Sequence, residues 1–406
     1  MLRINSPEVA RKGSRAHNLH LAYTPDLHAS ASRKSILPGP DEWIDLDKPF
    51  PTVCGFEEAT VVLNDSRMKA EYHQLFSAAG ACQGRAEIIG QRTLLNLNGE
   101  EHRRLRGKVA SEFRPRRVDR IRPFAQAIAA RILQELPESQ PFDIMQEFAL
   151  PFIEKTTAKF LGVPLSDMEA LGKSLELVKA GGADMHKRAK DFDNGCLELY
   201  DYALQALRDR FDHPTDDTLG HVSQQLKSGA IDEGFAGTFV VSLLSAGIEP
   251  TAFQLGILVE ELAGLTHVWD GVALGDLKIP SVVEELLRFR STNQGAARRV
   301  GETMDIKDFR FQKNATVIVS ITAANHDPRR FQRPEYFDTE ANKGSNLAFG
   351  FGPHFCIGAP LARAQLQEAL KVLATELHCP TVIDVRSQNG NGLVGPLELT
   401  VAIKRR

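Results

Sequence analysis

Cysteine and tryptophan are scarce in this chain of 406 residues, which has two tryptophans and five cysteines. The cysteines are scattered along its length: Cys54, Cys82, Cys196, Cys356 and Cys379. An odd number of widely separated cysteines is not a disulfide framework, and it is typical of proteins kept in a reducing compartment. We therefore expect a cytoplasmic protein without structural disulfides.

The sequence also lacks an early apolar run and a strong excess of one charge. Residues 1–32 contain several basic residues and histidines but no continuous apolar stretch, which argues against a signal peptide or a membrane anchor there. The formal net charge of −3 argues against nucleic acid or an acidic membrane as the main partner. A hydrophobic content of 42% allows a sizeable core.

One cysteine lies in a glycine-punctuated loop directly before a helical pattern. Residues 349–358 read Phe-Gly-Phe-Gly-Pro-His-Phe-Cys-Ile-Gly, and Pro360 then suits a first helical turn. Cys356 therefore precedes a helix N-terminus, where free N–H groups and the helix dipole favour a thiolate. A thiolate between Gly352 and Gly358, which allow close backbone approach, is suited to binding iron. A lone cysteine without this setting is most often a buried structural thiol.

A second motif is basic. His102 and Arg106 are one helical turn apart and share a face, so they can bind a carboxylate or a phosphate together. A merely solvated basic helix has the same pattern. Further cations follow nearby: Arg103, Arg104, Lys108, Arg114, Arg116 and Arg117.

Residues 233–265 predict a long helix through a large core, because the segment from Phe239 to Leu244 is apolar nearly all round. Residues 246–251 within it read Ala-Gly-Ile-Glu-Pro-Thr. Pro250 lacks the N–H that would bond the carbonyl of Ala246, so we expect a kink at residues 246–247.

Together these motifs resemble those of the cytochrome P450 superfamily, the haem-thiolate monooxygenases. The match covers roughly residues 55–406, and residues 359–363 look like the bacterial branch. Glu285 and Arg288, one turn apart, are similar to the family's structural Glu-x-x-Arg pair. The cysteine loop matches at its defining positions: Phe349, Gly350, Gly352, His354, Cys356 and Gly358.

The resemblance implies a mainly α fold with small β-sheets. It implies a single haem-binding domain over residues 43–406, preceded by an N-terminal arm or loop over residues 1–42. The implied cofactor is heme b (iron-protoporphyrin IX), with Cys356 as the ligand of the iron. Gly247 would leave room for dioxygen, and Glu249 would deliver protons. The residues implied to hold the haem propionates are His102, Arg106, Arg299 and His354.

The implied activity is that of a monooxygenase that activates dioxygen with electrons from ferredoxin and ferredoxin reductase. Its substrate would be a small, moderately apolar molecule of specialised metabolism, and we expect a monomer. Two alternatives remain: a peroxide-driven peroxygenase, and a non-catalytic module of the same fold that recruits partners. Peroxygenases of the family also place proline at position 250, but arginine where this chain has Glu249. Non-catalytic relatives tend to lose the cysteine loop, which is intact here.

Several positions depart from the family pattern, and one glycine pair lies outside it. Pro250 stands where the family has a threonine, and Thr251, one residue on, points about 100° away round the helix. No arginine follows residues 337–338, where the family places a third partner for the Glu-x-x-Arg pair. Asp308 and Asn314 replace turn glycines and tolerate left-handed backbone. Residues 181–182, two glycines, predict a hinge between helices.

Overall fold

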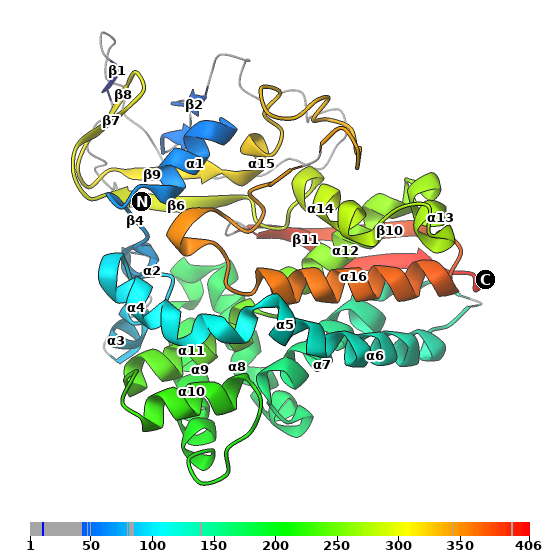
Figure 1. Ribbon diagram of the computed structural model, residues 1–406, viewed down its shortest axis with the longest axis horizontal. Coiled ribbons are helices and arrows are strands. Elements are labelled where there is room, and N and C mark those ends of the chain that lie inside the picture. The colour runs from blue at the N-terminus through cyan, green and yellow to red at the C-terminus, as the bar shows by residue number, and fades with distance from the viewer. Residues whose placement is uncertain are drawn as a thin grey trace. The chain divides into compact units, whose positions relative to one another are not determined.

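The computed structural model describes residues 10–11, 43–46, 48, 50–78, 80, 85–138, 140–342, 344–390 and 393–406. These residues are mostly helical with small sheets, which confirms the predicted fold class (Figure 1). The chain divides into two compact units. The first contains Met1–Glu71, Glu284–Cys356 and Gly392–Val394, and the second contains Tyr72–Val283, Ile357–Asn391 and Gly395–Arg406. A single haem domain over residues 43–406 stays a prediction. The predicted arm over residues 1–42 lies outside the described residues except at Ala10–Arg11.

Eight short strands lie wholly within the described residues of the first unit: β1 (Ala10–Arg11), β2 (Ile44–Asp45), β3 (Thr52–Val53), β4 (Met68–Lys69), β6 (Gly295–Val300), β7 (Met304–Ile306), β8 (Phe309–Phe311) and β9 (Thr316–Ser320). They form one sheet in the order β2-β3-β9-β6-β4 and another in the order β1-β8-β7. The small β-sheets that the family resemblance implies are therefore present. Asn314 has a φ of 69°, as expected, but the prediction for Asp308 was wrong because its neighbour Lys307 adopts the left-handed conformation instead, with a φ of 51°.

The helices of the first unit are α1 (Phe56–Asn64), α15 (Ile321–Ala324), the short 3-10 turn η5 (Gly352–His354) and the part of α14 (Ile279–Phe289) that starts at Glu284. Helix α1 packs its apolar face on the five-stranded sheet. A buried charge network anchors it: the Glu58 carboxylate accepts hydrogen bonds from Arg329, at 2.9 Å, and from Lys307. Burial alone would raise the pKa of Glu58, but these bonds hold it below its usual value.

The second unit carries most of the helices. Its helical elements are α2 (Tyr72–Ala78), α3 (Arg85–Gln91), α4 (Gly99–Val109), η2 (Ala110–Phe113), α5 (Pro115–Val118), η3 (Asp119–Ile121), α6 (Arg122–Glu135), η4 (Met145–Ala149), α7 (Leu150–Leu161), α8 (Leu165–Ala183), α9 (Met185–Asp209), α10 (Thr218–Lys227), α11 (Glu233–Ala246), α12 (Glu249–Ala263), α13 (Thr266–Leu274) and α16 (Ala359–Glu376). A third sheet, in the order β10-β11-β5, joins β5 (Phe142–Asp143), β10 (Thr381–Gly390) and β11 (Leu393–Ala402), whose first residues belong to the first unit.

The predicted hinge at residues 181–182 was wrong, because α8 runs through both glycines and the chain breaks at Asp184 instead. A Cβ atom on Gly181 would lie 2.6 Å from the Cβ atom of Phe192 on α9. Glycine therefore serves close packing of α8 against α9 rather than flexibility. The two helices lie side by side in the second unit (Figure 1).

The apolar segment over residues 233–263 comprises α11 and α12. Among the described residues it is the one helical segment long and apolar enough to cross a membrane, and 50% of its most apolar window is buried inside the protein. Phe235, Phe239 and Leu244 on α11 belong to the main core of the second unit. The core helices of soluble proteins share this combination of length and burial.

Candidate active site

The cysteine loop presents Cys356 instead of burying it. Gly350 and Gly352 adopt left-handed φ values of 73° and 70°, which glycine reaches without strain. The Cys356 N–H donates a hydrogen bond to the carbonyl of Phe349 at 2.9 Å, which closes the loop. The Cys356 side chain is exposed, whereas Cys54 is buried and burial raises its pKa to about 12. Cys356 is thus not a buried structural thiol.

Helix α16 begins at Ala359, three positions along the chain from Cys356. Pro360 lies in its first turn, as predicted, where the missing N–H costs no intrahelical bond. The N–H of Ala362 donates to the carbonyl of Gly358 at 3.0 Å.

In the first unit, Glu285 and Arg288 of α14 form the predicted pair. Both side chains are almost fully buried, and the guanidinium donates to the carboxylate at 2.8 and 2.7 Å. The remaining guanidinium N–H groups donate to backbone carbonyls of Asn325, Pro334 and Tyr336. A buried ion pair is tolerated only when its other hydrogen-bonding capacity is satisfied, and here it is.

The third partner of this pair is an amide. The side chain of Asn342 donates to Glu285 at 3.0 Å, and the backbone N–H of Asp338 donates to the same oxygen at 2.8 Å. The family pattern predicts an arginine directly after residues 337–338 as this partner, and the sequence did not predict the role of Asn342. An asparagine in a loop carries no local signal of this role, because only the fold brings it to Glu285.

The long central helix is interrupted where Pro250 predicts a kink. Helix α11 ends at Ala246 and α12 starts at Glu249, with Pro250 in its first turn. Ile248, between them, has φ −104° and ψ −66°. A Cβ atom on Gly247 would lie 2.3 Å from the carbonyl oxygen of Leu243, so the tightened turn itself requires a glycine.

The interruption is also the accessible part of this helix. Residues 235–241 and 251–259 are buried throughout, whereas no residue from 245 to 250 is buried, and the small side chain of Ala246 is exposed. The break therefore leaves backbone and small side chains of this helix accessible, while the stretches on both sides of it are buried.

Glu249 lies at this break and faces a cation from α8. Its Oε1 atom lies 3.7 Å from the ammonium of Lys179, which also lies 3.8 Å from Glu176. Burial raises the pKa of Glu249, and the Lys179 ammonium partly opposes that rise. Glu249 therefore keeps its proton to a higher pH than an exposed glutamate does. Sequence reasoning did not find Lys179.

The Thr251 side chain lies against its own helix. It is buried, and its hydroxyl donates to the Gly247 carbonyl of its own helix at 3.4 Å.

His102 and Arg106 share one face of α4, but they are not two cations. His102 is buried, and burial together with the nearby Arg106 charge lowers its pKa to about 4. His102 is therefore neutral at pH 7, and the pair combines one neutral donor with one guanidinium. Both groups remain suited to hydrogen bonding a carboxylate.

Arg298 and Arg299 lie on opposite faces of β6, because side chains alternate along a strand. The Arg299 guanidinium donates to Glu71 at 3.1 Å and to Asn314 at 3.0 Å. Arg298 is 4% exposed and on the same face as Val300, which belongs to the core of the first unit.

The predicted site residues fall into two groups. The first unit contains Arg299, His354 and Cys356, and the second unit contains His102, Arg106, Gly247 and Glu249. Within the second unit, Gly247 and Glu249 are brought together at the helix break, and His102 and Arg106 on α4.

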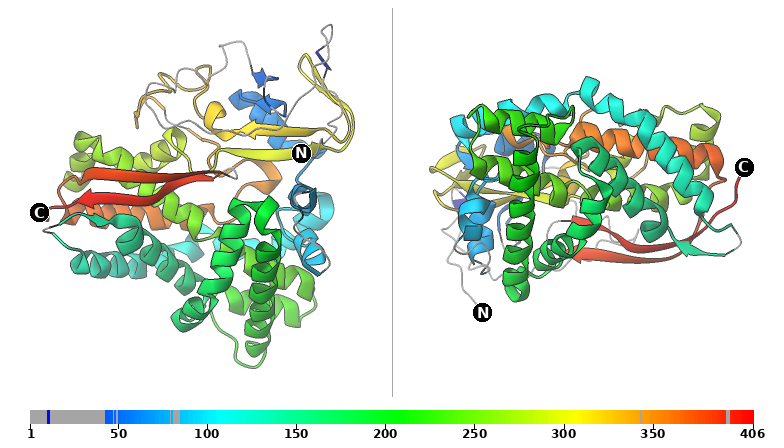
Figure 2. Two further views of the ribbon diagram at one scale, coloured as in Figure 1. Left: turned by 180° about the vertical axis from the view of Figure 1, so that it is seen from behind. Right: turned by 90° about the horizontal axis from the view of Figure 1, so that it is seen from below.

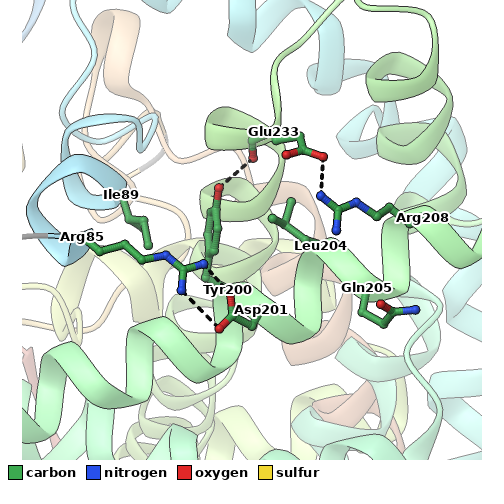
Figure 3. A pocket seen from close by; sticks show the side chains of 8 residues that line it. All are labelled: Arg85, Ile89, Tyr200, Asp201, Leu204, Gln205, Arg208 and Glu233. Atoms are coloured by element: carbon green, nitrogen blue, oxygen red, sulfur yellow. Dashed lines mark hydrogen bonds and ion pairs between the residues drawn. The ribbon is translucent and has the colours of Figure 1, made fainter.

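A separate groove of about 510 Å³ lies in the second unit between α3, α9 and the start of α11 (Figure 3). Its arginines are already paired: Arg85 donates to Asp201 at 2.5 Å, and Arg208 donates to Glu233 at 2.5 Å. Arg85 also lies over the ring of Tyr200. The ion pair of Arg85 with Asp201 therefore links α3 to α9. Because both arginines already have acidic partners, the groove is not suited to binding an anion.

Comparisons with known proteins agree with the cysteine loop and the fold. A cytochrome P450 family model matches residues 279–376. Luteothin monooxygenase of Streptomyces thioluteus is 30% identical over 362 residues, which cover 87% of this chain and 88% of that protein. 6-deoxyerythronolide B hydroxylase of Saccharopolyspora erythraea is 30% identical over 348 residues, 82% of each chain. The crystal structure of CalO2 superposes with a TM-score of 0.83 at 25% identity, over 90% of this chain and 93% of that one.

The chain therefore belongs to the cytochrome P450 superfamily. It is an oxidoreductase of the bacterial cytochrome P450 type, and its relatives are monooxygenases that act on small molecules.

Proposed function

We propose that this protein is a haem-thiolate monooxygenase that inserts oxygen into a medium-sized, moderately apolar molecule of specialised metabolism. The observation that carries the proposal is the exposed Cys356 on its glycine loop, because a purely structural cysteine would be buried. The names of two relatives, luteothin monooxygenase and 6-deoxyerythronolide B hydroxylase, support the substrate class.

The residues present fit heme b. Cys356 would hold the iron as a thiolate, and His102, Arg106 and His354 would donate to the propionates. Among the described residues no three His, Cys, Asp or Glu side chains gather, so a metal held by Cys356 needs its other ligands from a macrocycle. Bound haem would supply the activation of dioxygen, while the protein supplies orientation, exclusion of water and protons.

For the strand arginine we propose Arg298 in place of Arg299. The Arg299 guanidinium is occupied by Glu71 and Asn314, which already provide a carboxylate and an amide oxygen. Arg298 is buried on the other face of β6, where a bound carboxylate would stabilise its charge.

Haem retention distinguishes the two arginines. Arg298→Gln should weaken haem binding by about tenfold, since a charge-assisted hydrogen bond to a carboxylate is lost. Arg299→Gln is the matched control on the adjacent position, and it should retain haem like the unchanged protein. Haem content is measured by the pyridine haemochrome assay after dialysis against apomyoglobin. Loss of haem in Arg299→Gln alone would show that Arg299 holds the propionate.

Charge near Glu249 disfavours the peroxygenase alternative. A fatty-acid carboxylate at this position needs an excess of positive charge, but Lys179 lies between two carboxylates, Glu176 and Glu249. The non-catalytic alternative is disfavoured by the intact cysteine loop.

The proposed electron donor is an acidic ferredoxin, reduced by its reductase. Its docking face would comprise the cations of α4 to α5 that are exposed and have no acidic partner among the described residues: Arg104, Lys108, Arg114 and Arg116. Arg103 pairs with Glu100, and Arg117 pairs with Glu112 and Asp216, so these two contribute less. The described cysteines form no disulfide, which supports the cytoplasm as the place of action.

Electron supply tests the activity and the docking face together. Substrate turnover should require ferredoxin and reductase, and its rate should fall steeply with salt, because charge-steered association is screened. Turnover driven by hydrogen peroxide alone should be slower and insensitive to salt. A rate that is higher with peroxide than with any ferredoxin system would favour the peroxygenase.

Arg104→Glu separates docking from chemistry. The variant should slow ferredoxin-driven turnover by about tenfold at low salt and leave peroxide-driven turnover unchanged. Glu100→Gln, one turn away on the same helix, is the control, because it removes a negative charge from this face and should not slow reduction. An unchanged ferredoxin rate in Arg104→Glu would exclude this docking face.

A further inference from the structure

The longest strand among the described residues that lies at the edge of a sheet is β10. The sheet runs β10-β11-β5, so β11 pairs with one edge of β10, and the described part of the chain provides no strand to the other edge. The two long strands at the C-terminal end of the chain are visible in Figure 2. The opposite edge of the same sheet is β5, which has two residues. Short edge strands do not template pairing, but a long one exposes a row of unpaired backbone N–H and C=O groups.

The two faces of β10 have different side chains. Arg386 forms an ion pair with Glu398 of β11, so both lie on the same face, which also carries Asp384. Ile383 and Val385 then lie on the other face, where Leu399 and Val401 of β11 are fully buried. Ile383 is nevertheless 53% exposed and Val385 39% exposed. The core that covers β11 thus ends short of β10.

The centre of this strand carries neither proline nor lysine, and no charged side chain of it points inward. Residues 381–388 contain no proline and no lysine, and their two charged side chains carry opposite signs two positions apart. Natural edges are commonly protected by proline, by lysine or by a charge that points inward. Here both charges lie on the outer face, and the inner face carries no charge and has Ile383 and Val385 at its centre.

We propose that two copies of this protein associate by antiparallel pairing of their β10 strands about a two-fold axis at Val385. In this register Asp384 lies opposite Arg386 of the second copy, and Val385 lies opposite its own equivalent. The pattern Asp-Val-Arg is complementary to itself only when the strands are antiparallel. A parallel, in-register pairing would place Asp384 against Asp384 and Arg386 against Arg386, which is unfavourable.

The proposed contact stops at the dimer, as expected for an isologous interface, because it leaves no β10 edge for a third copy. Each copy uses its one long open edge, and the joined sheet ends at β5 on both sides. Arg386 would lie between Glu398 of its own chain and Asp384 of the second copy, so its single charge would bridge two carboxylates. Asp384 has no cationic partner among the described residues, and it would gain one. The association replaces the monomer expected from the sequence.

Sedimentation of the haem-loaded protein over a concentration series tests the proposal. Between about 1 µM and about 1 mM, the range in which small interfaces dissociate, the mass should rise from monomer to dimer and no further. Asp384→Arg should weaken the dimer by about tenfold, because each of the two symmetric contacts then sets arginine against arginine. The triple variant Asp384→Arg/Arg386→Asp/Glu398→Arg should restore dimerisation, because it exchanges the charges across the contact and also keeps the pair that position 386 makes with position 398 of its own chain complementary.

Hydrogen exchange locates the contact independently of any variant. Amides within residues 382–387 should exchange more slowly at high than at low protein concentration, and the carbon monoxide spectrum of each variant should show an intact haem site. A monomer at every concentration would overturn the proposal. So would a dimer that Asp384→Arg leaves unchanged, or protection of β10 that arises only with a different protein present.

Discussion

Cys356→Ser should abolish the absorption that reduced, carbon-monoxide-bound haem shows when a thiolate is its ligand. Serine is a harder and much less ionised ligand than cysteine, so the electron density supplied by sulfur is lost. The loop itself should remain folded, because it is closed by backbone groups: the Cys356 N–H donates to Phe349, and the Phe355 N–H donates to Gly352. Oxygenation activity should disappear with the spectrum.

A second cysteine provides the control for this change. Cys196 lies on α9, far along the chain from the loop and in no disulfide. Cys196→Ser should keep the thiolate spectrum and the turnover rate. If Cys356→Ser binds haem and retains the thiolate spectrum, another residue is the iron ligand and the proposed function has no basis. If neither variant binds haem, circular dichroism shows whether the fold was lost.

The parts of the site that local sequence could predict are those whose physical cause is local. The helix start at Pro360 and the interruption at Pro250 both follow from backbone constraints of the residue itself. Gly350 and Gly352 likewise act through their own left-handed φ angles. These features are the ones that the structure shows where the sequence predicts them.

The features that sequence reasoning missed depend on contacts between distant segments. Asn342 completes the Glu285 pair, and Lys179 reaches Glu249 from another helix. Neither residue has a local pattern that indicates its partner. The error at Gly181 has the same origin, because the glycine accommodates Phe192 of the following helix, and a glycine pair alone indicates flexibility as readily as close packing.

The choice between Arg298 and Arg299 shows a further limit. Two adjacent arginines on a strand are equivalent in composition, and a shift of one residue exchanges the faces of the sheet. Only the positions of Glu71 and Asn314 show which guanidinium is already occupied.

Glu249→Gln should slow turnover by on the order of 10²-fold, the usual contribution of a positioned proton donor. Glutamine keeps the shape and the polarity of the side chain but cannot release a proton. Thr251→Ala should barely change the amount of product formed per reductant consumed, because the Thr251 hydroxyl is bonded to the Gly247 carbonyl of its own helix. Product, hydrogen peroxide and reductant consumption are measured together for each variant.

The pH dependence identifies Glu249 more specifically than the rate. Burial raises the pKa of this carboxyl group, so the protonated form persists to higher pH, and turnover should fall as pH rises through that raised pKa. Glu249→Gln should remove this fall. Lys179→Met should move it to higher pH, because the ammonium that favours the charged carboxylate is then absent. Glu176→Gln, on the same helix as Lys179, should move the fall to lower pH, because it removes a charge that raises the pKa of Glu249.

The opposite result would reassign the proton path. If Thr251→Ala releases most reducing equivalents as hydrogen peroxide while Glu249→Gln stays coupled, Thr251 is the donor and must leave the Gly247 carbonyl during turnover. If neither variant changes coupling or the pH profile, protons come from ordered water or from the substrate alone. A substrate analogue that lacks its polar group then decides between these two sources. Loss of a substrate hydroxyl or amide would release hydrogen peroxide only if that group donates the hydrogen bond that Pro250 cannot donate.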